Sequence, residues 1–346
     1  MRIRSFFVLI AAACLLAACS SCELEAGSPR SITIMSYNLM TLFDPVDQGG
    51  EYQGFSVAKG EWDESLYRLR IKNLASAILA AQPGGPDILA LQEIENLRAL
   101  KDLAEALGGY AQLIKPRDEE AVLGCALLSR YPVRSLRSHR AMPPSGVSAS
   151  VPRNLLEAEF DLDGRPLIVY VAHWKSKLGG AEETEAERRA AAALIRSLTQ
   201  SRLAADPALA MVVAGDLNEN HDEYERIGAA YPTALRSPEA GPGDWLNISG
   251  DPSALLEHDT STLLLYTPWP SAQGYSYHYS GEQERIDHFL LSAGAMNGPA
   301  FYLAGFSAEP PSFLVDIEGR PQGWNSRTAR GYSDHLPIRL TLALPP

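Results

Sequence analysis

The sequence predicts a mixed α/β domain, and three observations support this prediction. Short runs rich in Ile, Val, Leu and Tyr recur along the chain, and segments with apolar residues at helical spacing separate some of them. The 346 residues are 46% hydrophobic, which suffices for one large core. Residues 31–346 show neither a linker composition nor an internal repeat. We therefore expect a single domain over residues 31–346.

The elements follow from these patterns. Apolar runs predict strands at residues 32–35, 88–91, 124–129, 155–160, 166–172, 210–214, 286–291 and 336–342. Apolar residues at helical spacing predict a helix over residues 67–81, and Gly84 and Pro86 follow it as breakers. Residues 182–204 are charged at their start and rich in Ala and Leu, which indicates a second helix. Residues 237–261 lack periodicity, so we expect an irregular segment near the substrate entrance.

The N-terminal segment differs from the rest of the chain. Arg2 and Arg4 precede an apolar run that ends at Ala18, and Cys19 follows it. This pattern predicts a lipoprotein signal peptide at residues 1–18, a lipid on Cys19 and a flexible tether at residues 19–30. An ordinary signal peptide or a short membrane helix is the alternative interpretation. We expect an exported protein anchored to the periplasmic or surface face of a bacterial membrane by its lipid alone.

The net charge of −12 argues against a broad basic surface for nucleic acid. It leaves room for a single phosphate that is met locally by a metal ion and a few cations. Apart from Cys14 and Cys19, the cysteines are Cys22 and Cys125, so a structural disulfide has little support. The spacing of zinc sites, a Walker loop and a GxSxG elbow are all absent from the sequence.

Polar residues follow several predicted strands at the point where each strand ends. They are Asn38 after ITIMSY, Glu93 after DILALQ, His173 after LIVYVA, and Asp216 with Asn218 after AMVVAG. Such side chains meet at one edge of a sheet, where α/β proteins gather their ligands. Asp334 and His335 precede the last strand and share this edge if that strand runs the opposite way. Carboxylate and amide oxygens suit Mg²⁺, so the pattern predicts phosphate chemistry at a magnesium site.

Six motifs occur in a characteristic order: MSYNLM, LQEIEN, AHWKSK, AGDLNEN, RIDHFLLS and YSDHLPI. This series resembles that of the endonuclease/exonuclease/phosphatase superfamily, which includes deoxyribonuclease I, exonuclease III type repair enzymes and neutral sphingomyelinases. The resemblance runs from Ser36 to Ile338. It implies a four-layer αββα sandwich, in which two mixed β-sheets pack face to face with helices outside and the active site lies at one end.

The resemblance also implies metal and water ligands. Glu93 would be the principal ligand of Mg²⁺, with Asn38 beside it and Asp334 contributing to metal or water binding. Mn²⁺ is expected to substitute for Mg²⁺. Asp216 would orient or deprotonate the attacking water, and Asn218 would hold a phosphate oxygen.

The remaining roles concern protons and the phosphate group. His335 would pair with Asp287, which fixes the imidazole tautomer, and would act either as the base or as a phosphate clamp. His173 would be a phosphate ligand or the acid for the leaving group. Arg153 and Lys175 would bind the scissile phosphate, and Lys177 would flank it together with Lys175, next to His173.

Three functions from different classes remain open. HWKSK with Gly179 and Gly180 resembles secreted bacterial nucleases, so we expect an endonuclease that hydrolyses DNA or RNA as a monomer. A sphingomyelinase-like or other phospholipid or phosphoester hydrolase is the alternative, with Trp269 as the stub of a membrane-entering segment and the lipid anchor in its favour. A non-catalytic binding protein of the same fold is the third.

Overall fold

The computed structural model describes residues 30–117, 121–142, 154–257 and 263–345. The predicted signal peptide, the predicted tether except Arg30, and Arg153 lie outside these residues, and so does Cys19. The two predicted helices and the eight predicted strands are present, and most of them extend further than predicted. No helix within the described residues is both long and apolar enough to span a membrane.

The first sheet has six strands and carries the N-terminal motifs. Its order is β15 (Tyr302–Ser307), β16 (Ile338–Ala343), β1 (Ser31–Leu42), β2 (Ile88–Ile94), β4 (Gly124–Ser129) and β3 (Gln112–Ile114). Strand β1 is parallel to β2 and antiparallel to β16, with Ser36 opposite Ile338. Residues Asp334 and His335, which precede β16, therefore lie at the end of the sheet where β1 and β2 finish, as predicted from the sequence.

The second sheet has eight strands. Its order is β5 (Val133–Arg140), β6 (Asn154–Leu162), β7 (Arg165–His173), β8 (Ala210–Asp216), β14 (Asp287–Leu291), β11 (Leu264–Tyr266), β10 (Leu246–Ser249) and β9 (Leu235–Arg236). Strand β8 is parallel to β7 and antiparallel to β14, so His173, Asp216 and Asp287 stand in one row. A separate hairpin, β12 (Tyr277–Tyr279) with β13 (Glu282–Glu284), rises at this end.

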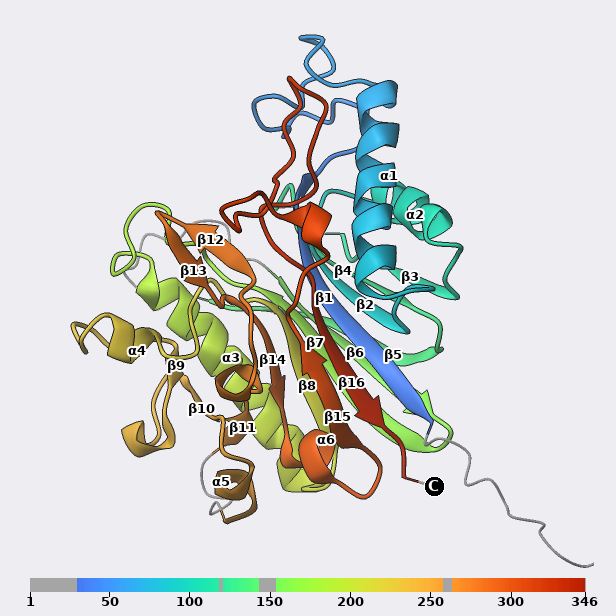
Figure 1. The fold of residues 1–346 in the computed structure, drawn as a ribbon. Coiled ribbons are helices and arrows are strands. Elements are labelled where there is room, and N and C mark those ends of the chain that lie inside the picture. The colour runs from blue at the N-terminus through green and yellow to red at the C-terminus, as the bar shows by residue number, and fades with distance from the viewer. Residues whose placement is uncertain (1–29, 118–120, 143–153, 258–262, 346) are drawn as a thin grey trace, which may run out of the picture.

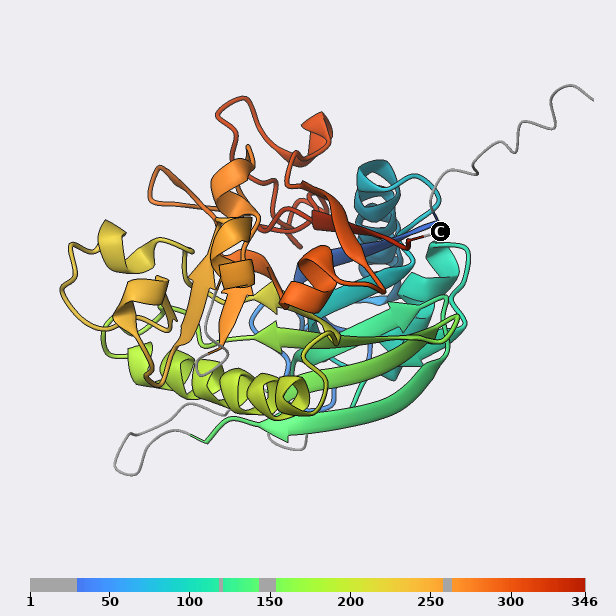
Figure 2. The same cartoon turned by 90° about the horizontal axis from the view of Figure 1, so that it is seen from below.

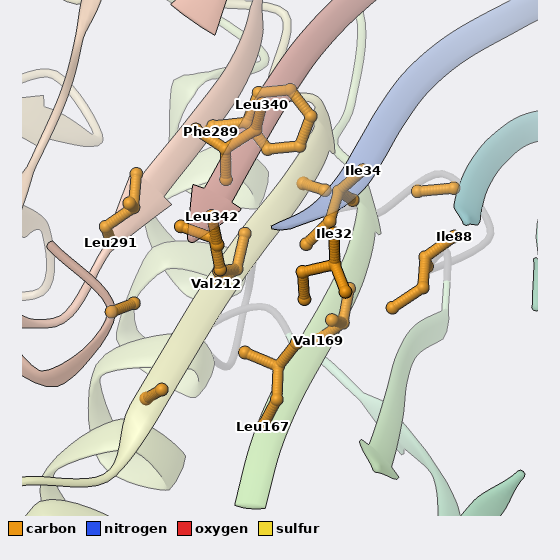
Figure 3. Packing of buried hydrophobic residues seen from close by; sticks show 14 of the residues in the cluster. Ile32, Ile34, Ile88, Leu167, Val169, Val212, Phe289, Leu291, Leu340 and Leu342 are labelled. Carbon is orange, nitrogen blue, oxygen red and sulfur yellow. The ribbon is translucent and has the colours of Figure 1, made fainter. Parts of the chain in front are cut away.

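The two sheets pack face to face, and helices cover their outer faces (Figures 1 and 2). Between them lies an apolar core to which both sheets contribute, including Ile32 and Ile34 from β1, Val169 from β7 and Phe289 from β14 (Figure 3). A second cluster joins the six-stranded sheet to α1 (Glu64–Ala81) and α2 (Leu97–Ala106), and a third joins the eight-stranded sheet to α3 (Glu185–Ala205). The predicted four-layer αββα sandwich is confirmed.

Local sequence explains where the covering helices begin. The Asp63 side chain accepts a hydrogen bond from the Leu66 N–H, and Asn96 caps α2 in the same way through the Ala99 N–H. The buried face of α1 carries Tyr67, Ile71, Leu74 and other residues at helical spacing, which fixes the rotation of this helix on the sheet.

Some elements were not predicted. Strands β5 and β15 alternate weakly in hydropathy because they lie at the sheet edges, and α2 is short. Residues 237–261, predicted to be irregular and near the substrate entrance, contain β10 and α5 (Pro252–Glu257). Helix α5 lies beside α6 (Ala293–Asn297), which follows β14 at the end away from Asp287 (Figure 1). The predicted place near the substrate entrance is therefore wrong for α5. The segment is also not irregular throughout, because pairing with β11, rather than a local sequence pattern, orders β10.

Candidate active site

Polar side chains from both sheets converge at one end of the sandwich. Strands β1, β2, β7 and β8 end there, whereas β14 begins there and β16 follows shortly after. We use the name site cluster for six residues brought together at this point: Asn38, Glu93, His173, Asp216, Asp287 and His335. All except the half-buried Glu93 are at most 6% exposed.

Gly215 brings the row of the second sheet together. Its φ is +149°, and a Cβ at this position would lie 1.9 Å from the carbonyl oxygen of Ala172 on β7. Only glycine permits this approach of β8 to β7. The next pair in register is His173 and Asp216, which the close approach sets side by side.

Asp216 is the centre of the site cluster. Its Oδ2 accepts a hydrogen bond of 3.0 Å from Asn38 Nδ2 of the other sheet, and it lies 3.4 Å from His173 Nε2 and 3.7 Å from His335 Nε2. Burial raises the pKa of the Asp216 carboxyl to about 7; the charge of His335 opposes this shift and the Asp287 carboxylate adds to it. Near neutral pH, Asp216 is therefore poised to accept or release a proton.

His335 and Asp287 form a buried pair. His335 Nδ1 lies 2.8 Å from Asp287 Oδ2, and the backbone N–H of Asp287 donates to Ser276 Oγ. Burial alone would lower the pKa of the His335 imidazole, but the carboxylates of Asp287 and Asp216 outweigh it, so the pKa lies well above its usual value. His335 is thus held as an imidazolium whose Nε2 faces Asp216. The ring of Tyr277 stacks on it at a centroid distance of 4.7 Å.

Glu93 supplies a carboxylate from a strained backbone. Its φ is +62°, in the left-handed region that residues other than glycine seldom adopt. Glu93 Oε2 accepts a hydrogen bond from the Thr41 N–H at 2.8 Å, and Oε1 lies 3.4 Å from Asn38 Nδ2 and 3.7 Å from His173 Nε2. Strain of this kind persists where the surrounding structure imposes it, commonly at functional sites.

The donor set fits a hard divalent cation on the Glu93 side of the cluster. Asn38 Nδ2 donates to both Glu93 Oε1 and Asp216 Oδ2. A divalent cation would stabilise these two carboxylates more strongly than a neutral amide does. Asp216, Asp287 and His335 also lie close enough to hold a metal ion. We assign these three to proton handling instead, because His335 Nδ1 is bonded to Asp287 and an imidazolium is not a ligand.

The other predicted residues take various places. Asn218 has a φ of +53°; its N–H donates to Asp216 Oδ1 and its side-chain amide to the carbonyl of Trp174. Asp334 is half-buried, and its charge is among the causes that raise the pKa of His335. Lys175 Nζ donates to the carbonyls of Ser176 and Leu178 in its own loop.

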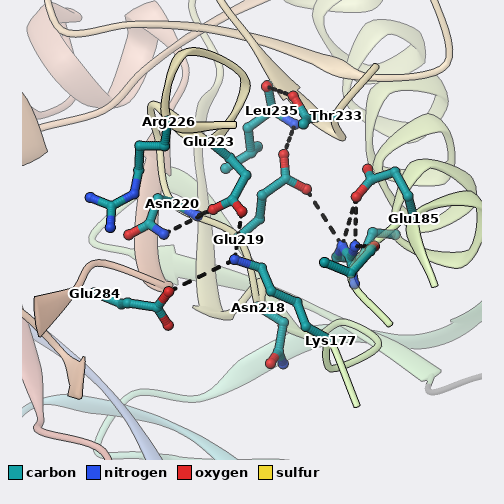
Figure 4. Close-up of polar contacts among 12 residues, drawn as sticks. Lys177, Glu185, Asn218, Glu219, Asn220, Glu223, Arg226, Thr233, Leu235 and Glu284 are labelled. Atoms are coloured by element: carbon teal, nitrogen blue, oxygen red, sulfur yellow. Dashed lines mark hydrogen bonds and ion pairs between the residues drawn. The ribbon is translucent and has the colours of Figure 1, made fainter. Parts of the chain in front are cut away.

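Two expectations at the rim require correction. Lys177, expected to flank the phosphate, forms an ion pair of 2.6 Å with Glu223 and lies 3.9 Å from Glu284 (Figure 4). Trp269, expected to be the stub of a membrane-entering segment, is fully buried, and its indole N–H donates to the carbonyl of Asp287. Trp269 therefore holds the first residue of β14 from inside the protein.

A second group of polar residues lies behind the loops of the site, and sequence reasoning singled out only Lys177 among them. This support cluster comprises Lys177, Glu185, Arg188, Glu219, Asn220 and Glu223 (Figure 4). Arg188 is fully buried and donates to the carbonyls of Lys175 and Ala181 as well as to Glu185. Glu219 accepts the N–H groups of Ala234 and Leu235. The only sequence signal was GG followed by an Arg-containing helix after HWKSK.

The fold and the site cluster define the class of protein, which is that of αββα phosphoester hydrolases. The sequence model of the Endonuclease/Exonuclease/phosphatase family matches residues 33–228, more than half of the chain, and the protein belongs to this family. Its members are typically metal-dependent phosphoesterases. No curated protein matches the sequence significantly.

Solved structures share the fold at low sequence identity. A truncated TDP2 of Caenorhabditis elegans is 17% identical with a TM-score of 0.54, and the match covers 90% of this chain and 98% of that one. A mannosyl-6-phosphatase of Bacteroides thetaiotaomicron is 18% identical with a TM-score of 0.55, covering 90% and 100%. A family protein from the same bacterium is 18% identical with a TM-score of 0.54, covering 92% and 100%. At these identities the likeness concerns the fold alone.

Proposed function

We propose that this protein is a divalent-metal-dependent phosphodiesterase that cleaves nucleic acid endonucleolytically. One observation carries the proposal of phosphoester hydrolysis. Two sheets bring together a carboxylate with a pKa near 7, a histidine held cationic by a second carboxylate, and the oxygen-bearing pair Glu93 and Asn38. The contacts that link these groups at Asp216 are 3.0 Å to Asn38 and 3.7 Å to His335. These are the groups that attack on a phosphorus atom requires.

The positions of the residues support a separate role for each of them. Asp216 in its ionised form accepts a proton from the attacking water, and the Asn218 N–H holds the carboxylate in place. His335 directs its Nε2 proton toward the side of Asp216, where it stabilises a phosphate oxygen. A divalent cation, when bound by Glu93 and Asn38, would neutralise charge on the phosphate. His173 lies between Glu93 and Asp216 and serves the leaving group.

Aromatic side chains beside the site support a nucleic-acid substrate. Tyr277 covers the His335 ring, and Tyr279, at the tip of the same hairpin, is 63% exposed. Exposed aromatic rings stack with any base, which gives affinity with little sequence preference. Lys177 is already paired with Glu223 and neutralises little phosphate charge, so binding is expected to be weak.

A phospholipid is the second candidate, because apolar side chains project beside the same mouth. Leu178 is 83% exposed in the loop that the Lys177–Glu284 contact holds against the hairpin of Tyr279. Leu178 and Tyr279, two exposed side chains on adjacent loops, suit contact with a bilayer. The predicted lipid anchor would keep the site near a membrane.

The substrate is decided by parallel assays of the purified protein. Supercoiled plasmid DNA, RNA, sphingomyelin vesicles and a sugar phosphate are each incubated with Mg²⁺, with Mn²⁺ and with chelator. We expect nicking of the plasmid and cleavage of RNA only with metal. Vigorous lipid hydrolysis without nicking would replace the nuclease by the second candidate, and turnover in excess chelator would contradict the metal chemistry.

We also propose that the protein is exported and tethered through a lipid on Cys19. The pattern of basic, apolar and small residues before Cys19 supports this proposal. Cys19→Ser is expected to leave the precursor unprocessed or to free the protein from the membrane fraction. Metabolic labelling with a fatty acid checks it, since a label retained in this variant would contradict the lipid site.

A further inference from the structure

Strand β1 carries an unusual bulge between two residues of the site cluster. Its pairing with β2 shifts between Asn38 and Leu42, so that Leu39, Met40 and Thr41 stand opposite Glu93. Met40 and Thr41 have φ values of +52° and +62°. Non-glycine residues adopt this region only when neighbouring groups compensate the strain.

The bulge holds both Asn38 and Glu93 by its backbone N–H groups. The Met40 N–H donates to Asn38 Oδ1 at 3.0 Å, and the Thr41 N–H donates to Glu93 Oε2 at 2.8 Å. The second bond leaves Glu93 Oε1 facing the site cluster. The shape of the bulge therefore decides where the two side chains that fit a cation point.

Arg70 of α1 holds the other side of the bulge. Its Nη2 donates to the carbonyls of both Leu39 and Met40, and its guanidinium lies 5.2 Å from the ring of Trp324. Among the described residues, its Nε and Nη1 find no hydrogen-bond partner, and burial lowers the pKa of Arg70 to about 10. A buried guanidinium with three of its five N–H donors unused is costly.

An apolar side chain would fill the same space without that cost. An arginine here adds hydrogen bonds to two carbonyls of the bulge and a positive charge close enough to interact with Glu93 and Asp334. Both contributions act on the site rather than on the core.

We propose that Arg70 is a positioning residue for the divalent cation. By holding the carbonyls of Leu39 and Met40 it fixes the bulge whose N–H groups orient Asn38 and Glu93, and so it sets the affinity of the site for the metal. The inference rests on the proposed metal-dependent function. It adds a residue from the covering helix that contacts neither the cation nor the substrate.

The test measures Mn²⁺ binding to the metal-free protein by electron paramagnetic resonance, with no substrate present. Arg70→Met removes both bonds and the charge, and we expect Mn²⁺ affinity to fall by at least about tenfold, the range seen when groups that orient metal ligands are removed. Arg70→Lys keeps the charge but not the paired geometry, so its affinity should lie between that of Arg70→Met and the wild type. Activity lost at low metal should return at saturating metal.

Arg188→Met is the matched control. Arg188 is equally buried but holds the support cluster and bonds neither Asn38, Glu93 nor the bulge. We expect its Mn²⁺ affinity to match the wild type. An equal loss in this variant would overturn the proposal, because the effect would then follow from losing any buried arginine.

The remaining outcomes separate the two proposals. If the wild type binds no Mn²⁺, or if Glu93→Gln binds it as tightly as the wild type, the proposed metal site itself fails. If Glu93→Gln weakens binding while the folded Arg70 variants bind as the wild type does, the positioning role fails alone. Should Arg70→Met not fold, Arg70→Lys decides by the same criterion, with circular dichroism as the check of folding.

Discussion

The site cluster and the support cluster lie next to each other but are built in opposite ways. In the support cluster, Lys177 pairs with Glu223, and Arg188 pairs with Glu185. In the site cluster, Glu93 and Asp216 face each other across the Asn38 amide. The support cluster fixes its loops by paired charges, whereas the Glu93–Asp216 side of the site cluster directs two carboxylates at one neutral amide and so favours a cationic ligand.

Backbone geometry separates the two clusters in the same way. Glu93 of the site cluster adopts positive φ, and so do three residues beside the cluster, Met40, Thr41 and Asn218. None of the six residues of the support cluster does. Strain and like charge occur together at the site, which indicates that stability is given up there for function. The four predictions below test this comparison.

The largest effect is expected at the buried His335–Asp287 pair. His335→Asn should lower turnover by about 10³-fold or more because the imidazolium is lost, and it should also lower the melting temperature because the buried Asp287 carboxylate loses its cation. Asp287→Ala should resemble it, and the double variant should add little because the two residues act as a unit. Steady-state kinetics and calorimetry check this prediction. Additive losses in the double variant would show that Asp287 has a separate role.

The support cluster should respond in stability rather than in chemistry. Arg188→Met should cost about 3–5 kcal/mol of unfolding free energy, since it leaves Glu185 and Glu219 as buried acids without their cation. Burial already raises the pKa of Glu219 well above its usual value. The control is Arg189→Met, whose partner Asp244 is half-exposed and whose loss should cost under about 1 kcal/mol. Urea unfolding of both variants checks the contrast, and equal costs would contradict it.

The pH dependence of the rate should report Asp216. Its pKa is raised to about 7, and its ionised form is the one that accepts a proton, so activity should fall as pH drops through an acid limb. With saturating Mg²⁺ the limb should lie at or below pH 7, because a bound cation favours the carboxylate. A flat profile of kcat/KM between pH 4.5 and 8 would contradict the role of Asp216 as base.

The smallest effect concerns stability at the same residue. A carboxyl with a raised pKa in the folded state stabilises the fold below its unfolded pKa and loses that contribution as pH rises through about 7. Asp216→Asn stays neutral, so at pH 8 it should melt a few degrees, about 2–4 °C, above the wild type. At about pH 4, near the pKa of a carboxyl in the unfolded chain, the two should melt together. Differential scanning calorimetry at both values checks the sign, and a lower melting temperature at pH 8 would reverse it.

The fold and most of the site cluster could be predicted from the sequence. Strand-end residues such as Asn38, Glu93, His173 and Asp216 could be recognised because a strand and the polar residue that follows it are contiguous in the chain. Six such motifs in one order are specific, although each alone is weak. Asp287 was paired with His335 through the same series, and the structure brings the two within 2.8 Å.

The tertiary structure alone decided how these groups are held. Arg70 supports a bulge about thirty residues earlier in the chain, Arg188 reaches the loop after His173, and Lys177 meets Glu223 instead of a free phosphate position. Part of the segment predicted to be irregular, Leu246–Ser249, forms strand β10 because it pairs with β11. Local pattern records which residues are polar and where a strand ends. The partner of a buried charge is chosen by the packing of two sheets and their helices, which no local pattern contains.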